Sequence, residues 1–189
     1  MMPLTRAFCA MFDISEAQAQ KFSKKFSPEF LPKNSYYLHT GERCNKFSFI
    51  ASGLVRVFAE TASKEVTQWI GDAGHFLTDL PSFMFREPAR WNIQALSDTT
   101  LWTLSYTEYA AFEREFPDWN LFEKRFVAKC FAMMESRIFD FIALSAEERY
   151  ARYFASFPNH FNEVPLQYIA SVLGMTPETL SRIRAKKTS

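Results

Sequence analysis

The feature that most constrains the fold of this chain is a stretch with neither glycine nor proline, from Asp118 to Ala143. Such a stretch predicts one continuous helix, roughly 39 Å long at 1.5 Å per residue. Two apolar stripes run along it at helical spacing, whereas a helix that packs against a single domain needs only one. We therefore expect one stripe to pack on its own chain and the other on a second copy in a homodimer, with burial inside a monomer as the alternative. The first stripe is Trp119, Phe122, Phe126, Cys130 and Met133, and the second is Val127, Phe131, Met134, Ile138 and Phe141.

Before this stretch, from about Asn34 to Ser105, apolar and polar residues alternate in short runs. The run "KFSFIASGLVRVFAE" alternates on both sides of Ser52-Gly53, which is typical of two half-buried strands joined by a turn. The run "WNIQALSDTTLWTLS" repeats the pattern around Ser97-Asp98, and "EVTQWIGDAGHFL" lies between the two. These short strands predict an antiparallel sandwich or barrel-like unit in a chain of the α+β class. The 21 phenylalanines are scattered along the chain, which favours core packing over a recognition site.

Three capping boxes predict the starts of helices, each with a Glu or Gln three positions after a serine. The first opens a short helix over residues 15–26, and the third opens a helix that Pro158 ends. Pro117 suits the first position of the long helix. The border between a β domain and a helical domain therefore falls near residue 144. The boxes are Ser15–Gln18, Ser105–Glu108 and Ser145–Glu148.

Two short helical patterns follow at the end of the sequence, from Leu166 to Gly174 and from Pro177 to Lys187. Their spacing fits a helix-turn-helix unit. Gly174 can adopt the backbone conformation of the turn, while Thr176 caps the second helix and Pro177 opens it. The residues expected in the shared core are Ile169, Ala170, Leu173, Leu180 and Ile183.

With that core buried, the second helix presents Glu178, Arg182 and Lys186, each one turn beyond the last. Residues 145–189 hold six Lys/Arg against four acids, a charge of +2, whereas the rest of the chain carries −1. This excess is concentrated at the second helix, where phosphate contacts would be made. A solvated basic tail on a structural helical hairpin is the alternative interpretation.

The order of β unit, long helix and helix-turn-helix resembles the Crp/Fnr superfamily of bacterial transcriptional regulators over essentially the whole chain. "FIASGLVRVF" is similar to the strand–SG–strand signature of the family, and "YIASVLGMTPETLSRIR" is similar to its recognition unit. The resemblance implies a double-stranded antiparallel β-helix, a jelly-roll-like β-roll with flanking helices, as an effector-sensing domain at residues 1–116. It implies a dimerisation helix at residues 117–143 and a DNA-binding domain at residues 144–189, with no room for a wing after the recognition helix. The implied partners are double-stranded DNA, a second copy, an unknown small-molecule effector and RNA polymerase.

The resemblance also implies roles for residues of the recognition unit. In the family, the residues that match Glu178 and Arg182 read base edges, while the matching Thr and Ser contact phosphates. Carried over, Glu178 would accept from a cytosine amino group and Arg182 would donate to guanine. Lys186 and Lys187, near the end of the helix, are better placed for phosphates. The predicted DNA-binding residues are Thr176, Glu178, Thr179, Ser181, Arg182, Lys186 and Lys187.

The predicted effector pocket departs from the members of the family that bind cyclic nucleotides. Those members have a Gly-Glu pair in the phosphate-binding cassette and a later Arg-Ser/Thr-Ala that grips the cyclic phosphate. Here Thr78-Asp79 and Ala89-Arg90-Trp91 stand in their places, so Asp79 could meet a ribose hydroxyl but the phosphate arginine is missing or shifted by one. We expect an effector other than a cyclic nucleotide, because a phosphate without its cation is costly to bury. The predicted pocket residues are Phe76, Thr78, Asp79, Arg90 and Trp91.

Other functions have less support in the sequence. The three cysteines and three histidines are dispersed without metal-ligand spacing, so we expect free thiols, no metal and no cofactor. A cupin-like enzyme on the same β architecture is therefore disfavoured, and we do not expect an enzyme. The alternative function is an effector-binding dimer whose degenerate helix-turn-helix serves protein interaction. No secretory signal or membrane-spanning run is visible, so the expected location is cytoplasmic.

Overall fold

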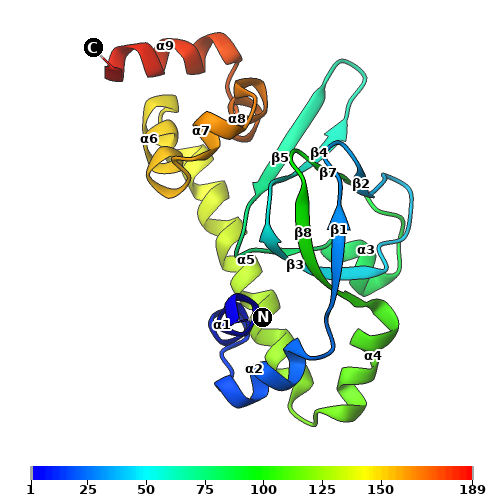
Figure 1. Ribbon diagram of the computed structural model, residues 1–189. Helices are drawn as coiled ribbons and strands as arrows, with labels where there is room; N and C mark the ends of the chain where they lie inside the picture. The colour runs from blue at the N-terminus through cyan, green and yellow to red at the C-terminus, as the bar shows by residue number, and fades with distance from the viewer. Residues whose placement is uncertain (1, 189) are drawn as a thin grey trace. The chain divides into compact units, whose positions relative to one another are not determined.

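The computed structural model describes residues 2–188 (Figure 1). In chain order, its elements are α1 (Met2–Phe12), α2 (Glu16–Ser23), β1 (Ser27–Leu31), β2 (Tyr36–Leu38), β3 (Lys46–Ser52), β4 (Val55–Glu60), β5 (Glu65–Gly71), β6 (Phe76–Leu77), α3 (Leu80–Phe85), β7 (Asn92–Ala95), β8 (Thr99–Ser105), α4 (Tyr106–Glu115), α5 (Trp119–Ala143), α6 (Ala146–Ser156), α7 (His160–Glu163), α8 (Leu166–Val172) and α9 (Pro177–Thr188).

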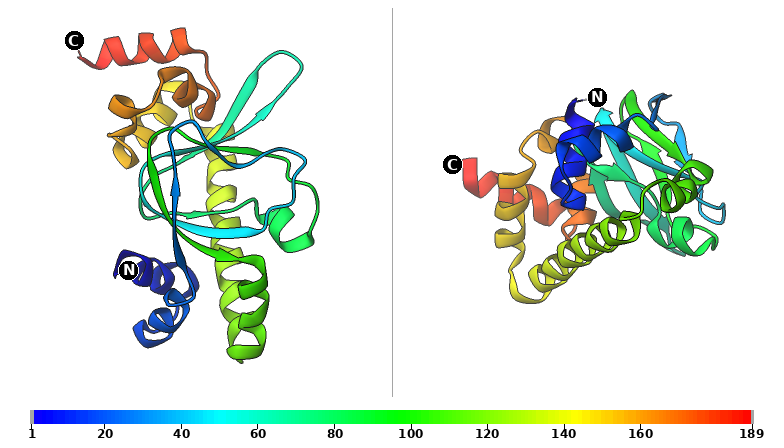
Figure 2. Two further views of the ribbon diagram at one scale, coloured as in Figure 1. Left: turned by 45° about the vertical axis from the view of Figure 1, so that its right-hand side comes forward. Right: turned by 90° about the horizontal axis from the view of Figure 1, so that it is seen from below.

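The chain forms two compact units. One contains the described residues up to Val57 together with Gly71–Phe131, and the other contains Phe58–Ile70 together with the described residues from Ala132 onward. The long helix α5 therefore begins in the first unit and ends in the second. Figure 2 gives two further views in which its course can be followed.

The strands form two antiparallel sheets, which confirms the predicted α+β class with a β-roll. The strand orders are β1-β8-β3-β6 and β2-β7-β4-β5. Strands β3 and β4, which flank Ser52-Gly53, lie in different sheets, and so do β7 and β8 on either side of Ser97-Asp98. The turns that the sequence predicts are therefore crossings from one sheet to the other, not hairpin connections within a sheet.

Strand β3 is more deeply buried than the predicted half-buried alternation. Its residues Phe47, Ser48, Phe49 and Ile50 are buried in succession. The Phe47 ring contacts those of Phe12 and Phe126, with ring centroids 6.5 and 5.6 Å apart. On the intervening position, the Ser48 hydroxyl lies 2.9 Å from Tyr37 Oη and 2.8 Å from Thr103 Oγ1. Both faces of β3 are thus covered, one of them by helices.

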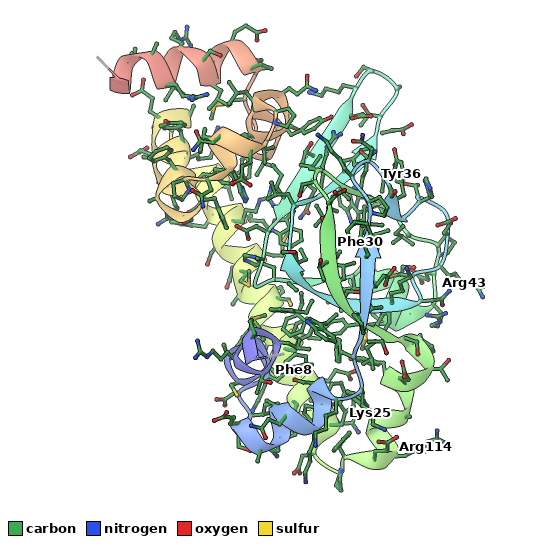
Figure 3. The ribbon with its side chains drawn as sticks, in the orientation of Figure 1. Phe8, Lys25, Phe30, Tyr36, Arg43 and Arg114 are labelled. Atoms are coloured by element: carbon green, nitrogen blue, oxygen red, sulfur yellow. The ribbon has the colours of Figure 1, made fainter. Side chains whose placement is uncertain are left out.

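The core of the first unit is aromatic, as the scattered phenylalanines predict. Phe8 on α1 (Figure 3) packs against Phe12, Phe22, Phe26 and Phe76, with ring centroids 5.0 to 5.9 Å apart. Aromatic pairs at such separations add to the free energy gained by burying apolar area. The phenylalanines of this unit among the largest fully buried side chains are Phe8, Phe12, Phe22, Phe47, Phe49, Phe83 and Phe112.

The three predicted capping boxes all form. Ser15, Ser105 and Ser145 each accept a hydrogen bond from the backbone N–H three residues on, and the Gln or Glu there accepts from the serine N–H. They begin α2, α4 and α6. The long helix begins at Trp119, so Pro117 lies in the preceding turn and not at the first helical position. Helix α1 is an element that was not predicted from the sequence.

The apolar stripes of α5 have different surroundings. Trp119, Phe122 and Phe126 of the first stripe are buried, and the Phe126 ring stacks on that of Phe12 at 4.7 Å. The second stripe remains exposed in the single chain: Phe131 is 68% exposed and Ile138 is 56% exposed. The prediction that one stripe packs on its own chain is confirmed for these first three residues.

The two sheet crossings meet at Gly53. Its φ of +96° lies in the left-handed region, and a Cβ there would come within 2.6 Å of Asp98 O and 2.7 Å of Thr99 Cα. Next to it, the Leu54 N–H donates to Ser97 Oγ at 3.0 Å and the Leu96 N–H donates to Leu54 O at 2.8 Å. Only glycine allows the two crossings to approach this closely.

We expect Gly53→Ala to lower the free energy of unfolding by about 2–4 kcal/mol, the combined cost of a left-handed alanine and of an overpacked contact. Urea denaturation followed by circular dichroism measures this. The matched control is Gly74→Ala, because Gly74 has φ +100° with nothing within 4 Å of the added Cβ. The control should lose only about 1 kcal/mol. Equal losses in both variants would show that the close approach of the crossings contributes nothing.

Candidate functional site

Helices α8 and α9 pack on each other through a small apolar core. Ile169, Ala170 and Leu173 are buried on one side of the turn, and Leu180 and Ile183 are buried on the other. Gly174 in the turn has φ +63°. These positions agree with the predicted core and with the predicted conformation of the glycine.

The start of α9 is capped as predicted. The Thr179 N–H donates to Thr176 Oγ1 at 3.3 Å, and the two threonine hydroxyls lie 3.2 Å apart. A hydrogen bond from its own backbone N–H, followed by one from the Thr176 hydroxyl, lowers the pKa of Glu178 below its ordinary value. Glu178 is therefore a carboxylate at neutral pH, and its oxygens can accept hydrogen bonds at the exposed end of the helix.

The predicted DNA-binding residues lie on the exposed side of this helix pair. Thr176, Glu178, Ser181, Arg182 and Lys186 are exposed, and Thr179 is half-buried. The Lys186 ammonium pairs with Glu147 of α6 at 3.1 Å. Lys187 lies in the last turn of α9, but its side chain falls outside the described part of the chain.

Arg184 of α9 has a position that was not predicted from the sequence. Its guanidinium carbon lies 5.6 Å from the centre of the Phe161 ring, and the side chain is half-buried. The helical spacing alone could have placed Arg184 off the exposed face, because it lies one turn after the buried Leu180.

In the predicted effector pocket, Asp79 is the residue that holds the segments together. Asp79 is only 3% exposed and caps α3, where its Oδ1 accepts from the Ser82 N–H at 3.1 Å. Its Oδ2 accepts from the Arg90 N–H at 3.2 Å. Nearby, the Thr78 hydroxyl donates to Lys46 O at 2.9 Å. Both carboxylate oxygens of Asp79 are therefore already engaged by the backbone of this segment.

The other predicted pocket residues are not all gathered around Asp79. The Arg90 guanidinium lies over the Trp91 ring, 5.0 Å from its centre, and Arg90 is exposed. The Phe76 ring packs in the aromatic core instead, 5.2 Å from the rings of both Phe8 and Phe47. The structure brings the Asp79 carboxylate and the Arg90 backbone together, and it places Phe76 with the core.

Arg86, a second cation near this segment, has a structural environment that sequence reasoning could not supply. It adopts φ +61° at the end of α3, and its guanidinium carbon lies 3.8 Å from the centre of the Tyr106 ring. The same group donates to Cys44 O at 2.9 Å and to Asn45 Oδ1. The charge of Arg86 thus ties the β2–β3 connection to the end of α3.

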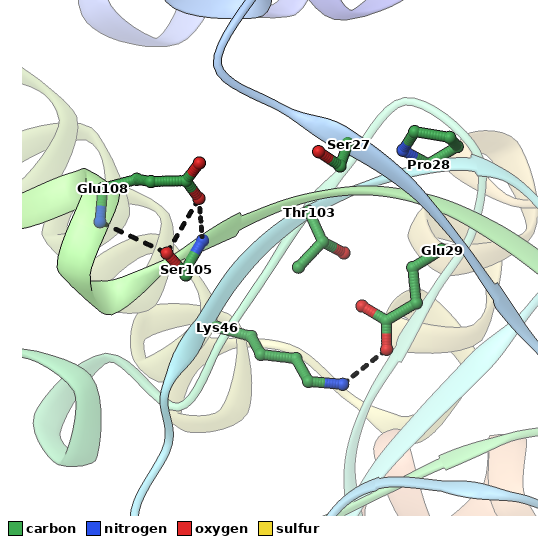
Figure 4. Close-up of a pocket in the computed structure, with 7 residues that line it drawn as sticks. All are labelled: Ser27, Pro28, Glu29, Lys46, Thr103, Ser105 and Glu108. Atoms are coloured by element: carbon green, nitrogen blue, oxygen red, sulfur yellow. Dashed lines mark hydrogen bonds and ion pairs between the residues drawn. The ribbon is translucent and has the colours of Figure 1, made fainter.

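A separate hollow of about 280 Å³ lies on the first unit (Figure 4). Two pairs of its polar groups bond to each other: Lys46 pairs with Glu29, and Glu108 accepts from the N–H and hydroxyl of Ser105. None of the predicted pocket residues lines it. The lining residues are Ser27, Pro28, Glu29, Lys46, Thr103, Ser105 and Glu108.

Metal-ligating side chains do not gather anywhere in residues 2–188: no group of three or more His, Cys, Asp or Glu in this range could hold a metal ion. Within the same range, no helix combines the length and the apolar character that a membrane span requires.

Comparison with known proteins shows what these features are similar to. Residues 28–115 match the model of the cyclic nucleotide-binding domain. No curated protein was found to match the chain in sequence.

Solved structures are similar over most of the chain. A mutant of CooA from Carboxydothermus hydrogenoformans is 22% identical with a TM-score of 0.62, and the match covers 88% of this chain and 78% of CooA. The catabolite activator protein of Thermus thermophilus is 19% identical with a TM-score of 0.61, and the match covers 95% and 85%. The c-di-GMP responsive global regulator CLP of Xanthomonas campestris is 15% identical with a TM-score of 0.66, and the match covers 92% of each chain.

Matches of this extent span the β-roll, the long helix and the C-terminal helical region of this chain. Residues 28–115 are therefore similar in sequence to the cyclic nucleotide-binding domain, and the chain shares the fold of these solved structures.

Proposed function

We propose that this protein is a homodimeric, sequence-specific DNA-binding transcription regulator whose β-roll senses an effector other than a cyclic nucleotide. In this proposal residues 1–116 sense the effector, residues 117–143 dimerise, and residues 144–189 bind DNA. The observation that carries the proposal is the exposed face of α9. Glu178, Arg182 and Lys186 project from it while Leu180 and Ile183 of the same helix are buried against α8.

The chemistry of this face suits the major groove. Arg182 lies on an exposed turn, so its guanidinium can donate two hydrogen bonds to guanine O6 and N7. The Glu178 carboxylate, one turn earlier, can accept from a cytosine amino group. Ser181, Thr176 and Thr179 can donate hydroxyl hydrogen bonds to phosphates beside the helix start, and Lys186 and Lys187 can neutralise phosphates near its end.

The exposed stripe of α5 supports a dimer. Val127, Phe131, Met134, Ile138 and Phe141 are all exposed and recur at three- and four-residue spacing. A contiguous apolar surface of this kind is unfavourable in water and is typical of a protein interface. A parallel pair of α5 helices would cover the stripe and would bring two recognition helices to two half-sites.

The contacts of Asp79 support an effector that is not a cyclic nucleotide. In cyclic-nucleotide-binding members the segment matching Ala89-Arg90-Trp91 grips a phosphate, but here the Arg90 N–H donates to the Asp79 carboxylate. An entering phosphate would meet this buried negative charge, while Arg86 is held by Cys44 and Asn45. Both features raise the cost of binding a cyclic phosphate.

A second candidate function is a dimer that uses α8 and α9 to bind another protein. The specific observation in its favour is the pairing of Lys186 with Glu147, which neutralises a cation that DNA phosphates would need. Selection of bound sequences from random double-stranded DNA separates the two candidates. Recovery of a two-fold symmetric site supports the proposal, whereas no enrichment at low salt favours the protein-binding function.

We expect Arg182→Ala to lose about 1–3 kcal/mol of binding free energy per half-site on the selected DNA and to relax preference at one base pair. The measurement is binding to selected and scrambled duplexes over a salt series. The control is Lys187→Ala, which should weaken binding to all sequences and reduce the salt slope by about one per lost phosphate contact. Equal losses on both duplexes for Arg182→Ala would contradict base reading by α9.

We expect Phe131→Glu and Met134→Glu to convert the dimer to monomer, because each places a charge in an apolar, desolvated interface. Sedimentation velocity at micromolar concentration measures this. The matched control is Ser136→Glu, which adds the same charge to an exposed position on the opposite side of α5. A wild-type protein that sediments as a monomer would rule out the proposed dimer.

We expect no saturable calorimetric or thermal-shift response to cyclic AMP or cyclic GMP at millimolar concentration. The physical reason is the Asp79 carboxylate at the Arg90 backbone. Saturable binding would refute this interpretation of the pocket. In that case Arg90→Ala and Arg86→Ala would identify which guanidinium contacts the phosphate.

A further inference from the structure

In the second compact unit, the C-terminal part of α5 is joined to the carboxyl end of α8 by two arginines. Arg137 of α5 donates from Nη2 to Val172 O at 3.3 Å. Arg149 of α6 donates from Nε to Leu173 O at 3.0 Å and from Nη1 to Leu144 O at 2.7 Å. The last carbonyls of a helix have no partner within it, and cations are favourable at that end. The two guanidiniums therefore fix where α8 ends relative to α5 and α6.

A side chain of α5 fills the turn between α8 and α9. A Cβ on Gly174 would come within 2.5 Å of Phe141 Cε1. The Phe141 ring thus occupies space that only glycine leaves open. Both guanidinium groups lie over this ring, Arg137 at 5.8 Å and Arg149 at 5.2 Å from its centre, within the range of cation–π attraction. We call Arg137, Phe141, Arg149 and Gly174 the α5–α8 joint. Phe141, which is 41% exposed, is also the last residue of the exposed stripe.

The joint is a rigid contact. Burial lowers the pKa of the Arg137 guanidinium, which nevertheless remains charged. A desolvated cation is costly to leave without its acceptor, so the bond to Val172 O resists breaking. Beyond the joint, α8 packs on α9 through Ile169 and Leu180, both fully buried. The position of α9 is thereby fixed to the C-terminal part of α5.

The same part of α5 carries the exposed residues Met134 and Ile138 of the proposed dimer surface. We propose that the α5–α8 joint positions each recognition helix relative to the dimer surface, and so determines which spacing of half-sites the dimer accepts. This inference rests on the proposed function. Its residues are positioning residues, since Arg137, Phe141 and Arg149 act through α8 and α9.

The physical argument is one of preorganisation. A dimer that binds two half-sites gains from the second contact only if its two recognition helices are held at the matching separation, about 34–36 Å for half-sites one DNA turn apart. A loosened joint would have to be ordered on binding, which weakens the bivalent complex. Binding to one isolated half-site does not require that order between subunits.

The test uses the full-length protein and the double variant Arg137→Met/Arg149→Met, which removes all three hydrogen bonds and keeps apolar stems. Neither arginine is one of the five apolar residues of the exposed stripe, although Arg137 borders it at Phe141. We therefore expect sedimentation still to report a dimer. The matched control is Arg152→Met. Arg152 lies on the same helix as Arg149, but it pairs with Asp140 of α5 and not with α8. For each protein, the dissociation constant is measured on three kinds of duplex. The first carries both selected half-sites at native spacing, the second has one to five base pairs added or removed between the half-sites, and the third carries one half-site.

We expect wild type and Arg152→Met to bind the native spacing at least tenfold more tightly than altered spacings. The double variant should bind one half-site within about twofold of wild type, lose about tenfold on the native spacing, and discriminate poorly among spacings. Retention of the wild-type spacing preference overturns the inference, and so does an equal loss on one and two half-sites. If the double variant fails to fold, Arg149→Met alone is held to the same criteria. A wild type that selects no DNA sequence would instead refute the proposed function itself.

Discussion

The packing of Phe126 against Phe12 and Phe47 is the interaction on which the first unit depends. These rings come from α5, α1 and β3, three elements far apart in the sequence. Their contact covers one face of β3, while Ser48 on the other face bonds to Tyr37 of the second sheet. Without Phe126, the long helix would lose its ring contact with Phe47 of β3, while Trp119 would still stack on Phe12 of α1. This contact buries the first apolar stripe of α5 at Phe126. The second stripe faces a different side of the helix and stays exposed.

The sequence predicts those parts of the fold that depend on interactions between neighbouring residues. The three serine capping boxes and the glycine- and proline-free stretch each depend on neighbouring residues, and the structure has them where the sequence places them. Helix α1 lacks such a signal, because its apolar residues are ordered mainly by contact with distant rings. The alternation around Ser52-Gly53 and Ser97-Asp98 predicts strands but does not reveal which sheet each joins, since that depends on long-range pairing.

The candidate site divides in the same way. The exposed face of α9 follows from helical spacing, so Glu178 and Arg182 could be placed from the sequence. Other interactions could not be predicted from the sequence, because they join residues at least eleven positions apart. These are the contacts that Arg137, Arg149, Lys186 and Asp79 make with distant partners. Phe76 is predicted in the pocket together with Thr78 and Asp79 of the same stretch of sequence. Its ring lies in the aromatic core, since its partners Phe8 and Phe47 come from distant elements that sequence spacing cannot reveal.

The buried carboxylate of Asp79 has a consequence for how this β-roll can be controlled. An anion that is part of the chain is present at a local concentration that no dissolved metabolite can match, and it cannot be lost by dilution. In a receptor that binds a diffusible anion, the fraction of occupied binding sites rises and falls with the concentration of that anion. Here the negative charge at the Arg90 backbone is supplied by the protein itself. If the β-roll senses an effector as we propose, that effector has to bind elsewhere in the molecule or displace a carboxylate that is covalently attached to the chain.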